Sequence, residues 1–282
     1  MKNKFKYIIA ILIIIVFVTI LIIFNSSKNT TNNIKIMLDP GHGGEIPNLK
    51  GAIISTGGRE VTLNNRLTLI IEELLIEEGY TVVFTNDPND EDDYISLTDR
   101  SKIANIDEPD LFISIHHDSI WDESVKGYSI YYSSYRPNID NEGVYVIYKN
   151  IKYKYIKEEI FNDRTHIYYE DDGVQKELIS GVDNYYVRDK TPDEVVLKSK
   201  EFAELLYDEL IKLEYMKPLR DTKDKTIMDN DLRITRTTNM PSILIEAGFV
   251  SNKDEAIQIS NEENQYAFAK KMVKAINNYF NK

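Results

Sequence analysis

The sequence predicts an α/β fold: a mostly parallel sheet with helices on both faces, plus a small β-rich insertion and an N-terminal transmembrane helix. Three observations lead to this prediction. Short apolar runs alternate along the chain with longer amphipathic segments, an order typical of parallel sheets covered by helices. One tyrosine-rich stretch breaks the alternation, and a long apolar run stands near the N-terminus. A chain of 282 residues is long enough for one or two domains.

The helices and strands follow from local patterns. From Glu60 onward, leucine and isoleucine recur at helical spacing, and Gly79 ends that helix. Ser96 is a suitable N-cap for a second helix, and Thr191 followed by Pro192 is a typical start for a third. The predicted strands span residues 34–40, 81–85, 110–116, 128–132, 231–235 and 242–246, and the predicted helices span residues 60–78, 96–106, 191–215 and 263–280.

The segment from about 136 to 190 fits this alternation poorly. It is polar and rich in tyrosine, and stretches such as "VYVIY" and "THIYY" repeat with a period of two. That period is typical of β-strands. We therefore predict a β-rich insertion that interrupts a single domain formed by residues 34–282.

The N-terminus is predicted to hold the protein at a membrane. Three lysines stand within the first six residues, ahead of an almost wholly apolar run from Ile8 to Phe24. As a helix this run would measure roughly 26 Å, about enough to cross a hydrocarbon core, and the lysines favour the cytoplasmic side. Residues 1–24 are therefore interpreted as a single-pass anchor and residues 25–33 as a linker, with the domain outside the cytoplasm. Cleavage of the segment as a signal peptide would instead give a secreted protein.

Composition excludes several kinds of function. A net charge of −12 argues against a nucleic-acid partner, because phosphates would be repelled over most of the surface. The absence of cysteine excludes a disulfide framework and any cysteine-ligated zinc or iron–sulfur site. With only four histidines in the chain, a histidine-based site has few residues to draw on.

Four ionisable side chains are predicted to meet at one edge of the sheet. His42 follows the first strand in "DPGHGG", His116 ends the third strand in "ISIHHD", and Glu246 ends the last strand in "SILIEAGF". Glu60 opens the first long helix, soon after the first strand. In parallel sheets covered by helices, sites lie just past the carboxyl ends of the strands, which is where these residues stand.

The two other histidines are predicted to lie outside this site. Adjacent strand residues point to opposite faces of a sheet, so His117 cannot face the same point as His116. His166 belongs to the insertion and is expected at the surface.

This combination of residues favours metal-assisted hydrolysis. Two histidines and one carboxylate are a usual ligand set for catalytic zinc, with the fourth position left for water. Zinc lowers the pKa of such a water to about 7 and polarises a carbonyl, and a second carboxylate can act as the base. Each residue alone also has an ordinary explanation: His42 as a cap for nearby carbonyls, His116 bonded to backbone, Glu60 complementing a helix dipole.

Four sequence blocks that occur in order resemble a known family. They are "DPGHGG", Gly58-Arg59-Glu60, "SIHHD" and "PSILIEAGFVSN", and they are similar to those of the zinc-dependent N-acetylmuramoyl-L-alanine amidases of bacterial cell walls, the amidase-3 type. The resemblance implies that His42, Glu60 and His116 bind one zinc ion and that Glu246 is the catalytic glutamate. It also implies that the chain cleaves peptidoglycan at the amide between N-acetylmuramic acid and the L-alanine of the stem peptide.

Three features depart from the family pattern. Asp118 replaces a common asparagine, so an extra acid stands near the site, where it either alters the pKa of the bound water or holds a ligand. Asn86 replaces a common arginine after the second strand. The insertion at about 136–190 is not part of the family core, and it is expected either to restrict the substrate, to bind an activator or partner protein, or to be a neutral elaboration.

Two alternatives to a peptidoglycan amidase stay open on the sequence. One is a catalytically silent wall-binding scaffold on the amidase fold, and the other is a different zinc hydrolase, such as a sugar deacetylase. For the amidase itself, daughter-cell separation and spore-cortex maturation are both expected settings.

Overall fold

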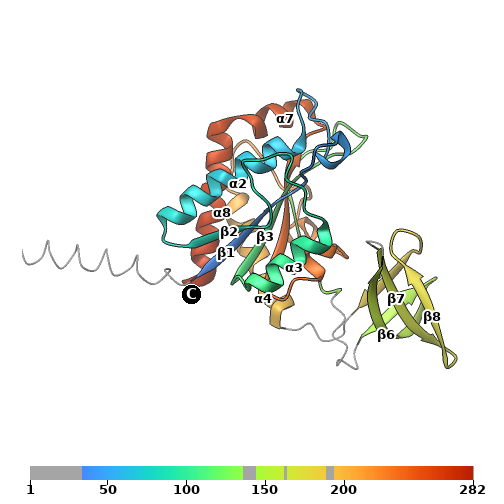
Figure 1. The fold of residues 1–282 in the computed structure, drawn as a ribbon. Helices are drawn as coiled ribbons and strands as arrows, with labels where there is room; N and C mark the ends of the chain where they lie inside the picture. Colours follow the sequence, from blue (N-terminus) through green and yellow to red (C-terminus); the bar gives the residue numbers. More distant parts are fainter. Residues whose placement is uncertain (1–33, 136–143, 162–163, 189–193, 282) are drawn as a thin grey trace, which may run out of the picture.

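The computed structural model describes residues 34–135, 144–161, 164–188 and 194–281 (Figure 1). The predicted anchor at residues 1–24 and the linker at 25–33 lie outside the described residues. Within the described ranges, none of the helices combines the length and the apolar character needed to cross a bilayer.

The core is a six-stranded sheet with the strand order β10-β4-β11-β3-β1-β2. Neighbouring strands run parallel except for the pair β4–β11, which is antiparallel. The sheet is therefore mostly parallel, as predicted. Its strands are β1 (Lys35–Pro40), β2 (Thr81–Phe84), β3 (Leu111–Asp118), β4 (Ser129–Tyr132), β10 (Ile227–Asp229) and β11 (Ser242–Phe249).

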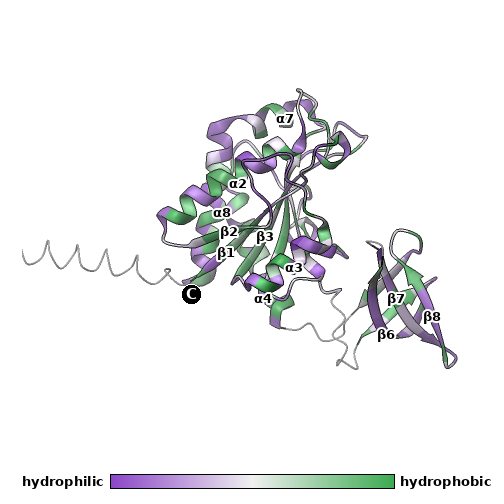
Figure 2. Ribbon diagram, viewed as in Figure 1, coloured by the Kyte–Doolittle hydropathy of each residue, from purple (hydrophilic) through white to green (hydrophobic). Residues whose placement is uncertain are grey.

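Helices cover both faces of this sheet. The helical elements are η1 (Pro47–Leu49), α2 (Glu60–Glu77), α3 (Leu97–Asp107), α4 (Glu194–Leu210), α5 (Lys223–Thr226), α6 (Arg233–Arg236), α7 (Lys253–Ser260) and α8 (Glu262–Phe280). Alternation along β1 separates two cores: Ile36 and Leu38 pack in the cluster that includes α2, α4 and α8, whereas Met37 packs with residues of α3 and α6. Figure 2 shows the hydrophobic residues concentrated along β1 to β3, between the helical layers.

The helix starts agree with the sequence where they are described. The Ser96 side chain accepts a hydrogen bond from the backbone N–H of Asp99 and caps α3 as predicted. Thr191 and Pro192, predicted to start the helix now seen as α4, lie outside the described residues.

The predicted strand at residues 231–235 is wrong. The segment forms the short helix α6, in which the backbone N–H of Thr237 donates to the Arg233 carbonyl. The alternating pattern "LRIT" is consistent with a strand, but tertiary contacts favour a helical turn, because residues three apart share a face. That turn directs both Arg233 and Arg236 toward Thr165 of the insertion, while Ile234 is buried in the core. The sheet instead gains β10, just upstream.

The predicted β-rich segment forms a separate antiparallel sheet. Its five strands have the order β8-β7-β6-β5-β9 and enclose their own hydrophobic cluster, which includes Val146, Ile167 and Val187. Figure 1 shows this sheet beside the α/β core, on the side of α3. The strands are β5 (Tyr145–Tyr148), β6 (Ile151–Phe161), β7 (Arg164–Asp171), β8 (Val174–Ile179) and β9 (Tyr185–Arg188).

Two arginines of α6 hold this sheet against the core. Arg236 forms an ion pair with Glu158 of β6, and its Nη2 donates to Thr165 Oγ1 of β7 at 3.1 Å. Arg233 Nη2 donates to the same hydroxyl at 3.0 Å. Because Arg236 is 5% exposed and also pairs with Asp231 at 2.8 Å, this contact is a buried, charge-assisted one.

Deleting residues 136–190 is expected to leave the α/β core folded and able to bind zinc, because the two sheets have separate hydrophobic cores. Loss of Glu158 leaves Arg236 with Asp231, so the expected cost is about 1–3 kcal/mol of stability. Urea unfolding followed by circular dichroism, with zinc analysis of the folded protein, measures both. Glu158→Gln is the matched control, because it removes the negative charge from the same contact in the intact chain. Loss of cooperative unfolding in the deletion variant would show that the insertion belongs to the core.

Candidate active site

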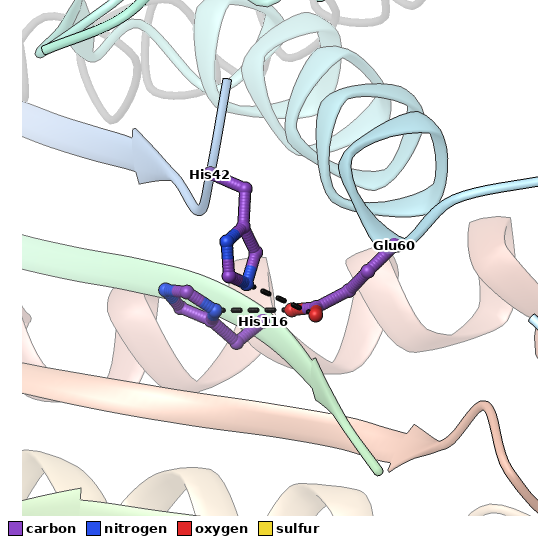
Figure 3. Close-up of side chains that lie close together, drawn as sticks. All are labelled: His42, Glu60 and His116. Atoms are coloured by element: carbon purple, nitrogen blue, oxygen red, sulfur yellow. Dashed lines mark hydrogen bonds and ion pairs between the residues drawn. The ribbon is translucent and has the colours of Figure 1, made fainter. Parts of the chain in front are cut away.

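Three of the predicted site residues converge at one end of the sheet. His42 lies on the turn after β1, Glu60 is the first residue of α2, and His116 lies near the end of β3 (Figure 3). His42 Nε2 is 3.0 Å from Glu60 Oε2, and His116 Nδ1 is 3.1 Å from Glu60 Oε1. One potential ligand atom from each residue lies within 4.8 Å of the other two. The grouping predicted from strand order is therefore confirmed for these three side chains.

The Glu60 carboxylate is held on both oxygens by neighbouring backbone and side-chain donors. The backbone N–H of Ala52 donates to Oε2 at 3.0 Å. The backbone N–H of His117 and the Asn64 side-chain amide both donate to Oε1 at 3.2 Å. These contacts orient the carboxylate toward the two imidazoles.

Close approach around the cluster requires glycine at two positions. A Cβ at Gly41 would overlap the His116 ring, and one at Gly51 would come within 2.5 Å of Glu60 Oε2. His42 itself has a φ of 71°, in the left-handed region. Few non-glycine residues adopt that conformation, and they cluster at functional sites. The close packing around the imidazoles therefore explains why the "DPGHGG" turn has glycine beside His42.

Burial and hydrogen bonding oppose each other at Glu60. Burial alone would raise its pKa, but the hydrogen bonds and charges of His116 and His42 hold the pKa well below the ordinary value. At His117, by contrast, burial is the dominant effect, and it lowers the pKa of the imidazole to about 4. Glu60 is therefore an anion at neutral pH and His117 is a neutral imidazole.

Glu246 lies beside the cluster on β11, paired in register with His116 on β3. Burial, together with the charges of Asp118 and Glu60, raises its pKa well above the usual value. Its Oε2 is buried and lacks a hydrogen-bond partner among the described residues. A carboxylate in this state binds a proton readily. Burial also raises the pKa of Asp118, and Asp118 Oδ1 accepts from the backbone N–H of Ser119.

Arg100 of α3 supports the turn that carries His42. Its guanidinium donates to Asp39 Oδ1 and the Pro40 carbonyl at 2.7 Å, to Asn86 Oδ1 at 2.8 Å, and to the His42 carbonyl at 2.5 Å. Asn86, the departure from the family pattern, is thus a buried partner of Arg100. Arg100 lowers the pKa of Asp39 against the effect of burial.

Arg100→Leu is expected to destabilise the protein by about 3–5 kcal/mol, because it leaves the buried Asp39 carboxylate without its charged partner. Since the folded pKa of Asp39 is depressed, its contribution is present above about pH 4 and is lost as pH falls. Urea unfolding at pH 7 measures the change. Lys102→Leu on the same helix, at a side chain 65% exposed, is the control and should change stability by less than about 0.5 kcal/mol. A loss below 1 kcal/mol for Arg100→Leu would contradict the buried-pair argument.

Two residues that support the site, Asn64 and Arg100, were not predicted from the sequence. Asn64 Nδ2 also donates to the Gly41 carbonyl at 3.1 Å, and its Oδ1 lies 2.7 Å from His117 Nδ1. The sequence did carry a signal for Asn64, because an asparagine four residues after Glu60 lies on the same helix face.

His117 is buried and turned toward Asn64, so it points away from the face of His116, as the strand alternation predicted. His166 is half-buried on β7, 2.7 Å from Glu177, rather than fully at the surface.

The cluster fits a zinc ion by its donor set. Two imidazole nitrogens and one carboxylate oxygen are the ligands of many catalytic zinc sites. With zinc–ligand distances of about 2.0–2.1 Å, a tetrahedral ion separates its ligand atoms by about 3.4 Å. The distances of 3.0 Å from His42 to Glu60 Oε2 and 3.1 Å from His116 to Glu60 Oε1 are close to that value, and one ligand atom from each of the three residues lies within 4.8 Å of the others.

Comparison with known proteins gives one consistent family. A family model described as N-acetylmuramoyl-L-alanine amidase matches residues 36–278. A Buchnera aphidicola protein, provisionally named as such an amidase, is 28% identical over 255 residues, covering 89% of this chain and 97% of that protein. The Neisseria meningitidis amidase AmiC is 26% identical over 246 residues, covering 87% of this chain but only 52% of AmiC.

Solved structures share the fold. The CwlD amidase of Clostridioides difficile, solved in complex with the GerS lipoprotein, superposes with a TM-score of 0.58. The alignment covers 88% of this chain and 99% of that chain at 20% identity. At this identity the likeness extends to the fold alone.

Proposed function

Because this chain belongs to the N-acetylmuramoyl-L-alanine amidase family, we propose that it cleaves the amide between N-acetylmuramic acid and L-alanine in peptidoglycan with the help of one zinc ion. The observation that carries the proposal is the group of His42, Glu60 and His116, whose ligand atoms lie within 4.8 Å of one another. These three residues would hold the ion. When bound, zinc supplies a Lewis acid that polarises the scissile carbonyl and lowers the pKa of a coordinated water.

Glu246 is the proposed general base. It lies next to His116 across the β3–β11 pair, and its raised pKa suits a group that gains and loses a proton during turnover. Glu246 would take the proton of the attacking water and deliver it to the amine of L-alanine as the amide bond breaks. The hydrogen bonds from Ala52, Asn64 and His117 hold the Glu60 carboxylate, and the hydrogen bond from Arg100 holds the His42 carbonyl. Together they keep the two imidazoles in place.

We further propose that residues 1–24 anchor the enzyme to the cell membrane and that the domain acts outside the cytoplasm. The lysines near the N-terminus and the run from Ile8 to Phe24 support this orientation. A partner protein at the insertion is also proposed. A relative has been solved with the lipoprotein GerS bound, and the separate sheet of β5–β9 offers a surface outside the α/β core.

Product analysis of digested sacculi tests the reaction. Amidase activity releases stem peptides with a free L-alanine amino group, whereas a deacetylase would release acetate. A scaffold would release neither. Chelation with a zinc-binding agent should abolish release, and added zinc should restore it. Release of acetate alone, or no release by zinc-loaded protein, would overturn the proposed reaction.

A further inference from the structure

The loop after β3, residues 119–128, carries the only tryptophan of the chain in an exposed position. Trp121 is 90% exposed and its neighbour Ile120 is 41% exposed, although tryptophan is on average a well-buried residue. A further exposed apolar side chain, Ile53 at 64%, lies on the loop between β1 and α2. Exposed apolar side chains that gather at the end of the sheet where a site lies are typical of a binding surface.

Hydrogen bonds on both sides of Trp121 tie this loop to the turn after β11. The backbone N–H of Ile120 donates to Ser251 Oγ at 3.2 Å. Asn252 Nδ2 donates to the Glu123 carbonyl at 2.8 Å. The exposed indole is therefore carried by an ordered backbone, so little loop entropy is lost when a ligand binds.

The turn after β11 also fixes the loop relative to the candidate active site. β3 carries His116 and β11 carries Glu246, and the two strands are paired in register. The same turn binds the loop between β1 and α2, because the backbone N–H of Ser55 donates to the Val250 carbonyl at 2.9 Å. Five residues of chain span at most about 18 Å, so the backbone of Trp121 lies within that distance of the backbone of His116. A ligand of several sugar rings can therefore contact both.

We propose that the indole of Trp121 stacks against a sugar ring of the glycan strand, which makes the loop of residues 119–128 a saccharide-binding surface. The inference rests on the proposed function and adds the side chain that holds the glycan arm of the substrate. Trp121 is a specificity residue in this proposal, because it lies outside the group of side chains that performs the chemistry.

The chemistry of an indole suits a pyranose ring. One face of an N-acetylhexosamine ring presents C–H groups, and its edge presents hydroxyl and acetamido groups. The indole offers a large, flat apolar surface together with one N–H donor. Stacking removes apolar area of both partners from water, which is favourable. Because tryptophan has only two side-chain torsions, ordering it costs little entropy.

The charges of the loop favour the neutral arm of the substrate. Residues 118–125 hold three acids, Asp118, Asp122 and Glu123, and no lysine or arginine. The glycan arm of muramoyl peptides is neutral once its lactyl group is in the amide bond, whereas the stem peptide has an acidic second residue and a free carboxyl terminus. The three carboxylates repel the peptide arm and can accept hydrogen bonds from sugar hydroxyls. They also disfavour an anionic membrane surface as the occupant.

Fluorescence of the full-length chain tests the proposal directly, because Trp121 is its only tryptophan. The probe is the β-1,4-linked tetramer of N-acetylglucosamine, which is neutral and lacks both the lactyl group and the peptide. With excitation at a wavelength that tyrosine does not absorb, the tetramer is expected to change the emission of Trp121 until the site is saturated. The tripeptide L-Ala-γ-D-Glu-L-Lys should leave the emission unchanged. No change with the tetramer, or an equal change with the tripeptide, would overturn the inference.

Three variants locate the binding surface by calorimetry with the same tetramer. Trp121→Ala should weaken binding at least about tenfold, as is typical when a tryptophan anchor is removed. Trp121→Phe should keep part of the affinity, because a smaller aromatic face remains. Ile106→Ala removes a side chain that is 83% exposed from α3, which precedes β3 and so lies at the other end of that strand, and it should bind like the wild-type chain.

Two results would contradict the stacking role of Trp121. One is unchanged affinity in Trp121→Ala, and the other is a Trp121→Phe variant that binds no better than Trp121→Ala. Because both side chains are exposed, none of the three substitutions should change stability by more than about 0.5 kcal/mol, so weaker binding does not reflect unfolding.

This test is separate from the test of the reaction. The tetramer contains no muramoyl amide, so its binding is measured without turnover. Failure to release stem peptides from sacculi would overturn the proposed function even if the tetramer bound at Trp121. Release of stem peptides by a chain that does not bind the tetramer would overturn only the role of Trp121.

Discussion

Replacing Glu246 by alanine is expected to lower kcat at least about 100-fold while zinc content stays normal, because the variant loses the base but none of the three ligands. Glu246→Gln should behave in the same way, since an amide of equal size cannot take a proton from water. Release of stem peptides from purified peptidoglycan measures the rate, and metal analysis of the same samples measures zinc. The loss should appear in kcat, because a general base acts in the transition state.

The matched control for Glu246 is Glu123→Ala, which removes an exposed glutamate from the loop after β3. It should retain wild-type kcat and zinc. A fully active Glu246→Ala variant would show that the base is assigned wrongly, and Asp118, whose charge acts on Glu246, would be the next carboxylate to test. If Glu246→Ala lost zinc instead, Glu246 would be a ligand rather than the base.

Replacing His42 by alanine is expected to reduce zinc occupancy strongly and to remove activity with it, because two ligands remain where three are needed. The left-handed φ of 71° at this position adds a complication, since alanine is strained there. His42→Asn resolves it, because asparagine tolerates the left-handed region and is not among the usual zinc ligands. Both variants should lose zinc after dialysis against a buffer that leaves wild-type zinc bound.

His166→Ala is the control for metal loss, because His166 lies in the insertion and contacts Glu177 rather than the cluster. Its zinc content and activity should match the wild-type chain. Normal zinc in both His42 variants would refute the ligand role of His42. A defect of equal size in His166→Ala would mean that the assay reports general damage to the fold.

Much of the fold was predictable because its determinants are local. The helix from Glu60 followed from apolar spacing, and the Ser96 cap followed from side-chain chemistry. The strand predicted at residues 231–235 was wrong because its pattern is ambiguous over so few residues. The helical turn of α6 is accompanied by contacts with Glu158 and Thr165, which are 78 and 71 residues away in the sequence. No local sequence pattern indicates such contacts.

For the site, the sequence by itself determined which side chains stand at the ends of β1, β3 and β11, because strand order in an α/β fold brings those ends together. Only the tertiary structure decided how they are held. Arg100 binds the His42 carbonyl, Asn64 orients Glu60, and burial beside Asp118 raises the pKa of Glu246. Such effects depend on distance and burial between residues far apart in the chain, which spacing along the sequence does not encode.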